Sequence, residues 1–447
     1  MLRSFRVANH RSLRDEQELL LMPQRPGKRE ALAVGAIYGA NASGKSTVLD
    51  ALRYVQEAVR DSYQRWSPIG PIRREPFRLD DDKRLESSWY VLEVLIDDVR
   101  WTYGFELDDS RILEEWLYTY PQQRRRAIFE RDSEGIRFGT AVANRRDRAR
   151  VLTDLIRENA LLLSLAAQSG LAEVLPMFSW LDRSLHLVTS GQMPVPSALA
   201  DFLVTNPERQ EEVRQLIAAA DFGVTDLEVR AGSDDRLRRA LGDLAEARER
   251  VNRSLDGRGD NVAAMMLHLE RAEVEADDAR ALASRSRVRL AHGNAGIFFE
   301  PPDESAGTKS WLALLPPILE ALSAGHTLFV DEIDTSLHPR LVARVIELFR
   351  SPETNVGGGQ LLFTTHDATL LGTSLGVETL KRDEIWFVEK AEDGATSLFP
   401  LSDFKPRKGE NTERRYLGGS YGAVPAVFSE SLVRQLVKAR EQRNAAS

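Results

Sequence analysis

The stretch GANASGKS, residues 39–46, decides how this chain folds. It matches the pattern G-x-x-x-x-G-K-[ST] and lies between an apolar run at 31–38, which predicts a strand, and an amphipathic segment at 47–61, which predicts a helix. In such a loop the backbone N–H groups surround phosphates, and the helix dipole attracts them. We expect Lys45 to reach the β- and γ-phosphates of ATP as a catalytic residue, and Ser46 to ligate Mg²⁺. The other residues expected to contact the nucleotide are Gly39, Asn41, Ser43, Gly44 and Thr47.

A second motif, LFVDE at 328–332, is an apolar strand that ends in two carboxylates. Asp331 is expected to hold Mg²⁺ through water, and Glu332 to activate the attacking water as general base. Asp331 follows Ser46 by 285 residues, so a large insertion must separate the two motifs.

Two features flank the acidic strand. Upstream, ESAGTKSWLALL at 304–315 predicts a Ser-x-Gly turn that opens a helix, and Ser305 with the N–H of Gly307 can bind a phosphate there. Because this turn is remote from Lys45 in the chain, we expect it to serve the ATP held by a second subunit. Downstream, LLFTTHD at 361–367 predicts a strand that carries His366 at its C-terminal end.

The rest of the chain predicts an α/β protein in four parts. Residues 1–147 hold the phosphate loop and, at 88–130, an antiparallel meander. Residues 148–290 are rich in Ala, Leu, Arg and Glu and predict a helical insertion or arm. At 291–400 helices alternate with strands, which predicts a parallel sheet with crossovers, and 401–447 form a C-terminal tail.

Composition narrows the chemistry and the surroundings. The chain has no cysteine, which excludes disulfides and thiolate metal sites. It shows neither a signal peptide nor the roughly 20 uninterrupted apolar residues of a spanning helix, so we expect a cytoplasmic protein without membrane contact. The net charge of −8 gives no global attraction to nucleic acid. Binding to nucleic acid would need the local arginine clusters at 124–126, 145–150 and 285–289.

Taken together, these motifs resemble those of ABC-class ATPases of the soluble SMC, RecF and OLD-like branch. Within this branch, the chain resembles most closely the AbiL- and RloA-type ATPases of abortive infection. The resemblance includes NHRSL at 9–13, NALLLSLAAQ at 159–168, VDEIDTSLHP at 330–339 and RRYLGGSYGAVP at 414–425. The resemblance implies an ABC-type P-loop ATPase head, with a mixed sheet and an antiparallel β lobe, that carries the helical insertion. It also implies a homodimer held together by ATP.

The resemblance also assigns roles to single residues. Ser305 and Gly307 would be the signature turn acting in trans, Asp334 would line the dimer interface, and His366 would contact the γ-phosphate. Gln168 would sense Mg²⁺, with Gln122 and Gln123 as alternatives. Arg11 and Ser12 would touch nucleotide, unless they belong to an ordinary surface loop.

Two functions remain open at this stage. The first is an ATP switch in an antiphage defence system that works with a separate effector protein, a nuclease or a toxin. The second is a RecF- or SMC-like ATPase of DNA repair. The resemblance favours defence, and a fused nuclease is disfavoured because no Asp-x-Asp pair set on strands follows His366. Whether the YLGGSYGAVP tail caps the sheet or binds a partner is left open.

Overall fold

The computed structural model describes most of the 447-residue chain in ordered segments. The described residues are 1–24, 30–143, 146–189, 197–220, 223–230, 235–253, 262–282, 287–293, 297–299, 303–335, 337–376, 378–405 and 410–424, together with 434, 437, 438 and 442.

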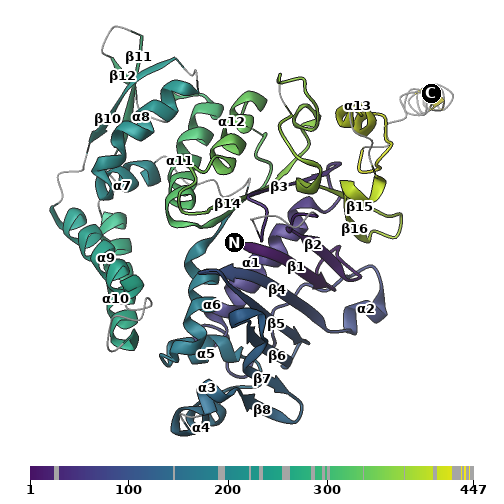
Figure 1. Ribbon diagram of the computed structural model, residues 1–447, viewed down its shortest axis with the longest axis vertical. Coiled ribbons are helices and arrows are strands. Elements are labelled where there is room, and N and C mark those ends of the chain that lie inside the picture. The colour runs from purple at the N-terminus through teal and green to yellow at the C-terminus, as the bar shows by residue number, and fades with distance from the viewer. Residues whose placement is uncertain are drawn as a thin grey trace.

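A six-stranded sheet forms the centre of the upper body (Figure 1). Its order is β16-β15-β3-β14-β13-β9, and all neighbours are parallel except β16 and β15. The strands are β3 (Val34–Gly39), β9 (Leu185–Val188), β13 (Thr327–Val330), β14 (Gln360–Thr365), β15 (Ile385–Lys390) and β16 (Thr396–Pro400). The crossovers run through α1 (Lys45–Asp61), α11 (Ala306–Ala324) and α12 (Pro339–Arg350). The predicted parallel sheet with crossovers is confirmed.

A seven-stranded antiparallel sheet lies below it, in the order β2-β1-β4-β5-β6-β7-β8 (Figure 1). Asp97 and Asp98 have φ of 49° and 59°, which suits the two-residue turn between β4 and β5. This sheet confirms the predicted meander. Its strands are β1 (Leu2–Ala8), β2 (Gln17–Leu20), β4 (Ser88–Ile96), β5 (Val99–Leu107), β6 (Ile112–Thr119), β7 (Arg126–Asp132) and β8 (Gly135–Phe138), and α2 (Asp81–Leu85) precedes β4.

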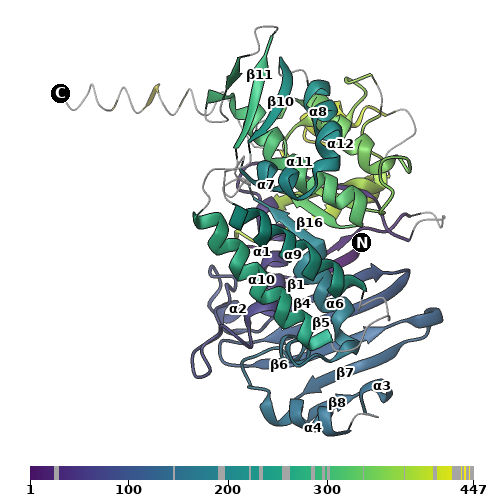
Figure 2. The ribbon, with the colours of Figure 1, turned by 90° about the vertical axis from the view of Figure 1, so that its left-hand side faces the viewer.

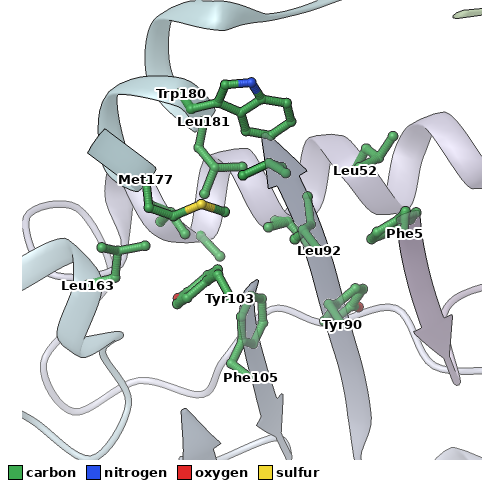
Figure 3. Close-up of a cluster of buried hydrophobic side chains, with 14 of the residues drawn as sticks. Phe5, Leu52, Tyr90, Leu92, Tyr103, Phe105, Leu163, Met177, Trp180 and Leu181 are labelled. Atoms are coloured by element: carbon green, nitrogen blue, oxygen red, sulfur yellow. The ribbon is translucent and has the colours of Figure 1, made fainter. Parts of the chain in front are cut away.

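Helix α1 joins the two sheets into one core. Leu52 of α1, Tyr90 of β4 and Phe329 of β13 are all buried in one hydrophobic cluster. Figure 3 shows Leu52 and Phe5 beside the aromatic rings of the antiparallel sheet. The helix that follows the phosphate loop is thus fixed on both sides, because apolar side chains of both sheets pack against it.

The helices that follow residue 148, where the helical insertion was expected to begin, pack first on the head. After α3 (Thr140–Ala143), the helices α4 (Arg146–Leu155), α5 (Leu162–Gln168) and α6 (Leu175–Ser179) lead into β9, the edge strand of the six-stranded sheet. Leu163, Met177, Trp180 and Leu181 are buried in the same core as Tyr103 (Figure 3). Residues up to Val188 therefore belong to the head, because their apolar faces are covered by it. The spacing of apolar residues predicts a helix, but it does not show whether that helix packs on the head or in the insertion.

After β9, helices α7 and α8 and strand β11 still pack on the head, since Leu199, Val213 and Leu290 are buried in one cluster with Phe363 of β14. Helices α9 and α10 project beside the head (Figures 1 and 2). Helices α9 and α10 bury their own small core, which includes Leu244, Val251 and Leu269. A three-stranded antiparallel sheet, β10-β11-β12, was not predicted within this largely helical region. The elements are α7 (Ser197–Thr205), α8 (Gln210–Ala219), β10 (Val224–Arg230), α9 (Asp235–Arg253), α10 (Val262–Leu282), β11 (Arg287–His292) and β12 (Phe298–Phe299).

The described part of the tail packs on the head. Beside α13 (Thr412–Leu417), Tyr421 is buried, and its ring stacks on Phe387 of β15 at a centroid distance of 5.4 Å. Tyr416 stacks on the same ring at 5.7 Å. Residues 416–424 of the YLGGSYGAVP segment therefore cap the sheet, and Pro425 lies outside the described residues. In the described residues, no helix combines the length and apolar character needed to cross a membrane.

Candidate nucleotide-binding site

The phosphate loop connects the end of β3 to the start of α1. Gly44 caps α1 with φ 109°, a conformation that glycine adopts without strain. A Cβ on Gly39 would lie 2.5 Å from Ser43 Oγ and 2.6 Å from the carbonyl oxygen of Val388. Both glycines are thus required by backbone geometry. Asn41 and Ser46 are exposed at the surface of the loop, where a ligand can reach them.

Lys45 lies almost entirely inside this loop, with 5% of its surface exposed. Its Nζ donates hydrogen bonds to the carbonyls of Gly39 at 2.7 Å and Ala40 at 3.0 Å. Burial lowers the pKa of Lys45, and the negative charges of Glu332, Asp334 and Asp331 act in the opposite direction. Lys45 and the carboxylates that follow β13, the first of them 286 residues away, therefore share one electrostatic environment.

Strand register explains why these distant motifs meet. β14 lies between β3 and β13, with Thr365 opposite Tyr38 and Phe363 opposite Val330. Because the three strands are parallel, the residues that follow them emerge at one edge of the sheet. That edge carries Gly39, Asp331 and His366, as the sequence predicts.

Thr364 organises the two acidic residues. Its Oγ1 donates to Asp331 Oδ1 at 2.6 Å and accepts the Glu332 N–H at 2.7 Å. The Asp331 residue is 5% exposed, and its own N–H donates to the Val188 carbonyl of β9 at 2.8 Å. Glu332 has φ 49°, an uncommon value for a residue with a side chain. The sequence analysis did not single out Thr364, because a threonine in a buried strand carries no distinctive signal.

Asp334 and His366 form a pair within one chain. His366 Nδ1 lies 2.9 Å from Asp334 Oδ2, and the His366 N–H donates to the same oxygen at 3.3 Å. The Asp334 side chain is 5% exposed, whereas that of His366 is 59% exposed. Asp334 was expected to line a dimer interface, but its carboxylate is turned toward His366. We infer that it orients the histidine, which is free to face a ligand.

Ser305 and Gly307 lie at the N-terminus of α11. Ser305 Oγ accepts the Thr308 N–H at 3.1 Å and is the N-cap, and the residue is exposed. Gly325 ends α11 in the left-handed conformation, and the chain turns back at once into β13. Because α11 runs antiparallel to β13, its N-terminus points to the sheet edge that carries Asp331. The hydrogen bonds of Ser305 in the described structure are local to α11, so nothing there joins this turn to Lys45 of its own chain.

Gln168, expected as the residue that senses Mg²⁺, lies at the end of α1 opposite to the phosphate loop. Its Nε2 lies 3.5 Å from Ser164 Oγ, which in turn accepts the N–H of Tyr63 just beyond the end of α1. Ser46 is at the other end of that helix, roughly 25 Å away at 1.5 Å per residue. Gln168 therefore cannot reach a cation held by Ser46.

The alternatives Gln122 and Gln123 are no nearer. They follow Thr119, at the end of β6. Across the antiparallel sheet Thr119 pairs with Trp101, Trp101 with Val94, and Val94 with Leu2, at the start of β1. The end of β1 that approaches the phosphate loop is the opposite one. The structure thus places none of the three glutamines beside Ser46.

The NHRSL segment lies against the phosphate loop. Ser12 Oγ is 3.2 Å from Thr47 Oγ1, and Thr396 Oγ1 lies 2.8 Å from Ser12 Oγ and 2.9 Å from the Ser43 carbonyl. Arg11 Nε lies 2.8 Å from Asp50, one turn after Ser46 on α1. Arg11 and Ser12 are thus neighbours of the loop. Asp50 could have been found from its i+4 spacing to Ser46, whereas Thr396 gives no sequence signal.

The residues present fit a nucleotide with a divalent cation. Ser46 exposes a hydroxyl at a helix N-terminus, and Thr364 engages one carboxylate oxygen of Asp331. Among the described residues, Ser43 Oγ and Asp334 Oδ1 are buried without a hydrogen-bond partner. Unpartnered buried polar atoms are costly, which is consistent with a loop whose polar atoms are completed by a ligand.

Comparison with known structures gives SMC head domains. The head domain of Pyrococcus furiosus Smc, with an extended coiled coil and bound to the C-terminal domain of ScpA, is 13% identical, with a TM-score of 0.40 and coverage of 90% of this chain and 97% of that one. The SMC head domain of Thermotoga maritima is 14% identical, with a TM-score of 0.39 and coverage of 89% and 98%. No curated protein matches this chain.

The head has the predicted α/β architecture, with a largely parallel sheet, an antiparallel lobe and a helical arm. A family model, AAA_21, described as "AAA domain, putative AbiEii toxin, Type IV TA system", matches residues 35–372. The match includes the phosphate loop, the acidic strand and His366, and spans more than half of the chain. The chain therefore belongs to the AAA_21 family of P-loop ATPase domains.

Proposed function

We propose that this protein binds ATP with Mg²⁺ between two copies of itself and hydrolyses it to ADP and phosphate. The observation that carries the proposal is that the phosphate-binding groups at one sheet edge fall into two separate sets. Lys45 and the acidic residues lie together in one chain, whereas Ser305 is an exposed helix N-cap whose hydrogen bonds are local to α11. ATP bound to the phosphate loop of a second copy would supply a phosphate to that turn.

Each residue near the loop has a task that follows from its surroundings. Lys45 neutralises phosphate charge, and Ser46 and Asp331 would hold Mg²⁺, which supplies further charge neutralisation when bound. Glu332 removes a proton from the attacking water, and its backbone is held by Thr364. His366, oriented by Asp334, donates to the γ-phosphate.

Complementation between two inactive variants tests the shared site. Lys45→Ala removes the loop ammonium, so nucleotide binding by that chain is lost. Ser305→Arg places a long side chain at the α11 N-terminus, so the chain cannot complete its partner's site. In a mixture, half of the dimers combine the two variants and contain one intact site of two, so we expect about a quarter of the native ATPase rate.

The readout is phosphate release from each variant alone and from the equimolar mixture. Lys390→Ala, at an exposed lysine of β15, is the matched control and should keep full activity. A mixture as inactive as its components would rule out the shared site. Normal ATP affinity in Lys45→Ala would contradict the phosphate-loop assignment itself.

We further propose that the ATPase serves a bacterial antiphage system with a separate effector protein. The support is the description of the matching family, "AAA domain, putative AbiEii toxin, Type IV TA system", together with the resemblance to AbiL- and RloA-type ATPases. Phage plating on cells that carry this gene with its neighbouring genes tests the role. Protection that disappears with Glu332→Gln supports it, and equal plating with and without the genes contradicts it.

The arginine clusters give DNA repair less support than the sequence suggested. Arg125 pairs with Glu130 at 3.1 Å, Arg148 donates to the Gly170 carbonyl, and Arg289 pairs with Glu228 at 3.2 Å. Arg145 and Arg285 lie outside the described residues. Salt-dependent duplex binding that weakens when Arg145, Arg146 and Arg148 are neutralised would nevertheless favour the repair function.

A further inference from the structure

Three side chains with metal-binding groups meet at the end of the sheet remote from the phosphate loop. They are His186 of β9, Glu320 of α11 and His326, which directly precedes β13. One ligand atom from each lies within 4.8 Å of the other two, and all three residues are half-buried. The ATPase chemistry proposed above uses none of them.

The fold brings the three together for clear reasons. In the parallel pair β9 and β13, His186 lies opposite Leu328. Side chains alternate along a strand, so His326 shares a sheet face with Leu328 and is the diagonal neighbour of His186. The left-handed Gly325, φ 77°, turns α11 directly into β13 and holds Glu320, in the last turns of the helix, near the strand start.

The two imidazoles already face each other. His186 Nε2 lies 3.0 Å from His326 Nδ1, and the ring planes differ by 22°. In tetrahedral coordination with Zn–N bonds of 2.0–2.1 Å, the two ligand nitrogens are about 3.3 Å apart. The separation of the two nitrogens is therefore within a few tenths of an ångström of the value that a shared cation requires.

The surroundings of the two rings disfavour their protonated forms. Burial lowers the pKa of His186, and burial with the charges of His186 and Arg248 lowers the pKa of His326 to about 4. The backbone of Arg183 forms a hydrogen bond with the His186 ring. Arg248 of α9 is itself 3.6 Å from Glu273 of α10.

We propose that His186, Glu320 and His326 bind one divalent transition-metal ion of the zinc class. Two imidazoles and a carboxylate suit Zn²⁺ or Co²⁺ and discriminate against Mg²⁺, which prefers oxygen ligands in an octahedron. The ion connects β9, α11 and β13. The same two strands hold Asp331 at their other end, through its bond to the Val188 carbonyl. Metal binding thus braces the strands that position the acidic motif.

Cobalt titration of chelator-treated protein tests the site. With Mg²⁺ in large excess to occupy oxygen sites, one equivalent of Co²⁺ should give the visible absorbance of a four- or five-coordinate ion, and Zn²⁺ should abolish it by displacement. One equivalent of Zn²⁺ should also raise the thermal unfolding midpoint. Lys45→Ala should bind Co²⁺ like the native chain, which separates this proposal from the ATPase proposal.

Variants locate the ion. His186→Gln and His326→Gln should lose the stoichiometric absorbance, and Glu320→Gln, which preserves shape, should weaken binding. His268→Gln, at an exposed histidine of α10, is the matched control and should bind normally. Circular dichroism checks that each variant is folded. The proposal is overturned if native protein takes up less than one equivalent, or if the His186 and His326 variants bind as tightly as the control.

Discussion

The hydroxyl of Thr364 donates a 2.6 Å hydrogen bond to the carboxylate of Asp331, in a position where both residues are buried. The same oxygen accepts the backbone N–H of Glu332. A single hydroxyl in the neighbouring strand thus sets the orientation of the predicted Mg²⁺ carboxylate and of the peptide that carries the predicted general base.

Replacing this hydroxyl by a methyl group should damage both stability and catalysis. In Thr364→Val, Asp331 and the Glu332 N–H lose a buried partner, which should cost about 1–3 kcal/mol of unfolding free energy. The ATPase rate should fall, and half-maximal activity should need more Mg²⁺. Urea unfolding and a Mg²⁺ titration measure the two effects. Thr153→Val, at an exposed position of α4, should change neither, and native Mg²⁺ dependence in Thr364→Val would refute the orienting role.

Removing the charge of Glu332 should stop hydrolysis without preventing ATP binding. Glu332→Gln should reduce the rate by about 100-fold or more, because a positioned base contributes that much. ATP should then accumulate between two chains, and size-exclusion chromatography with ATP should give a dimer. Glu347→Gln, an exposed glutamate of α12, should behave like the native protein. Elution of Glu332→Gln as a monomer with ATP would argue against the shared site.

Asp50 should contribute stability that disappears in acid. Burial raises the pKa of Asp50, but the hydrogen bond from His10 and the charges of Arg11, His10 and Arg53 outweigh it, so the folded pKa lies below the ordinary 3.8. A depressed carboxyl pKa stabilises the folded state above pH 3.8 and ceases to do so as the pH falls through the folded pKa.

Asp50→Asn should therefore be less stable than native protein at neutral pH, and the difference should shrink below pH 3.8. Urea unfolding at several pH values measures it. Asp98→Asn, in the exposed turn after β4, should leave the pH profile unchanged. A native-to-variant difference that is constant down to the lowest pH would show that Asp50 is not the titrating group.

The tail should be part of the folded head. Tyr421 is 1% exposed and packs against Phe387 and Phe404, so Tyr421→Ala should lower the unfolding free energy by about 3 kcal/mol. Leu417→Ala, at a residue 64% exposed, should cost little. Thermal or urea unfolding compares the two. Equal stability of both variants would mean that the tail does not cap the sheet.

The sequence-based predictions that the structure confirms rest on the spacing of residues within short segments. The GANASGKS loop needs only its own glycines and the dipole of the helix after it, and the meander needs only alternation and turns. Parallel pairing then brings the carboxyl ends of adjacent strands to one edge, so LFVDE and LLFTTHD could be placed beside the loop before any coordinates. The sequence alone therefore determined the phosphate loop, the acidic strand and the alternation of helices and strands in the head.

Contacts between distant segments were decided by the tertiary structure. Gln168 is the last residue of α5, in the segment NALLLSLAAQ. Because α5 packs near the C-terminal end of α1, Gln168 lies far from Ser46 at the other end of that helix. The segment up to Val188 is helical by pattern but buried in the head core. Tyr421 reaches Phe387 from the segment after α13. Thr364 with Asp331, and His186 with His326, are residues whose meeting depends on strand register. No local pattern encodes that register, because it is set by which buried faces fit together.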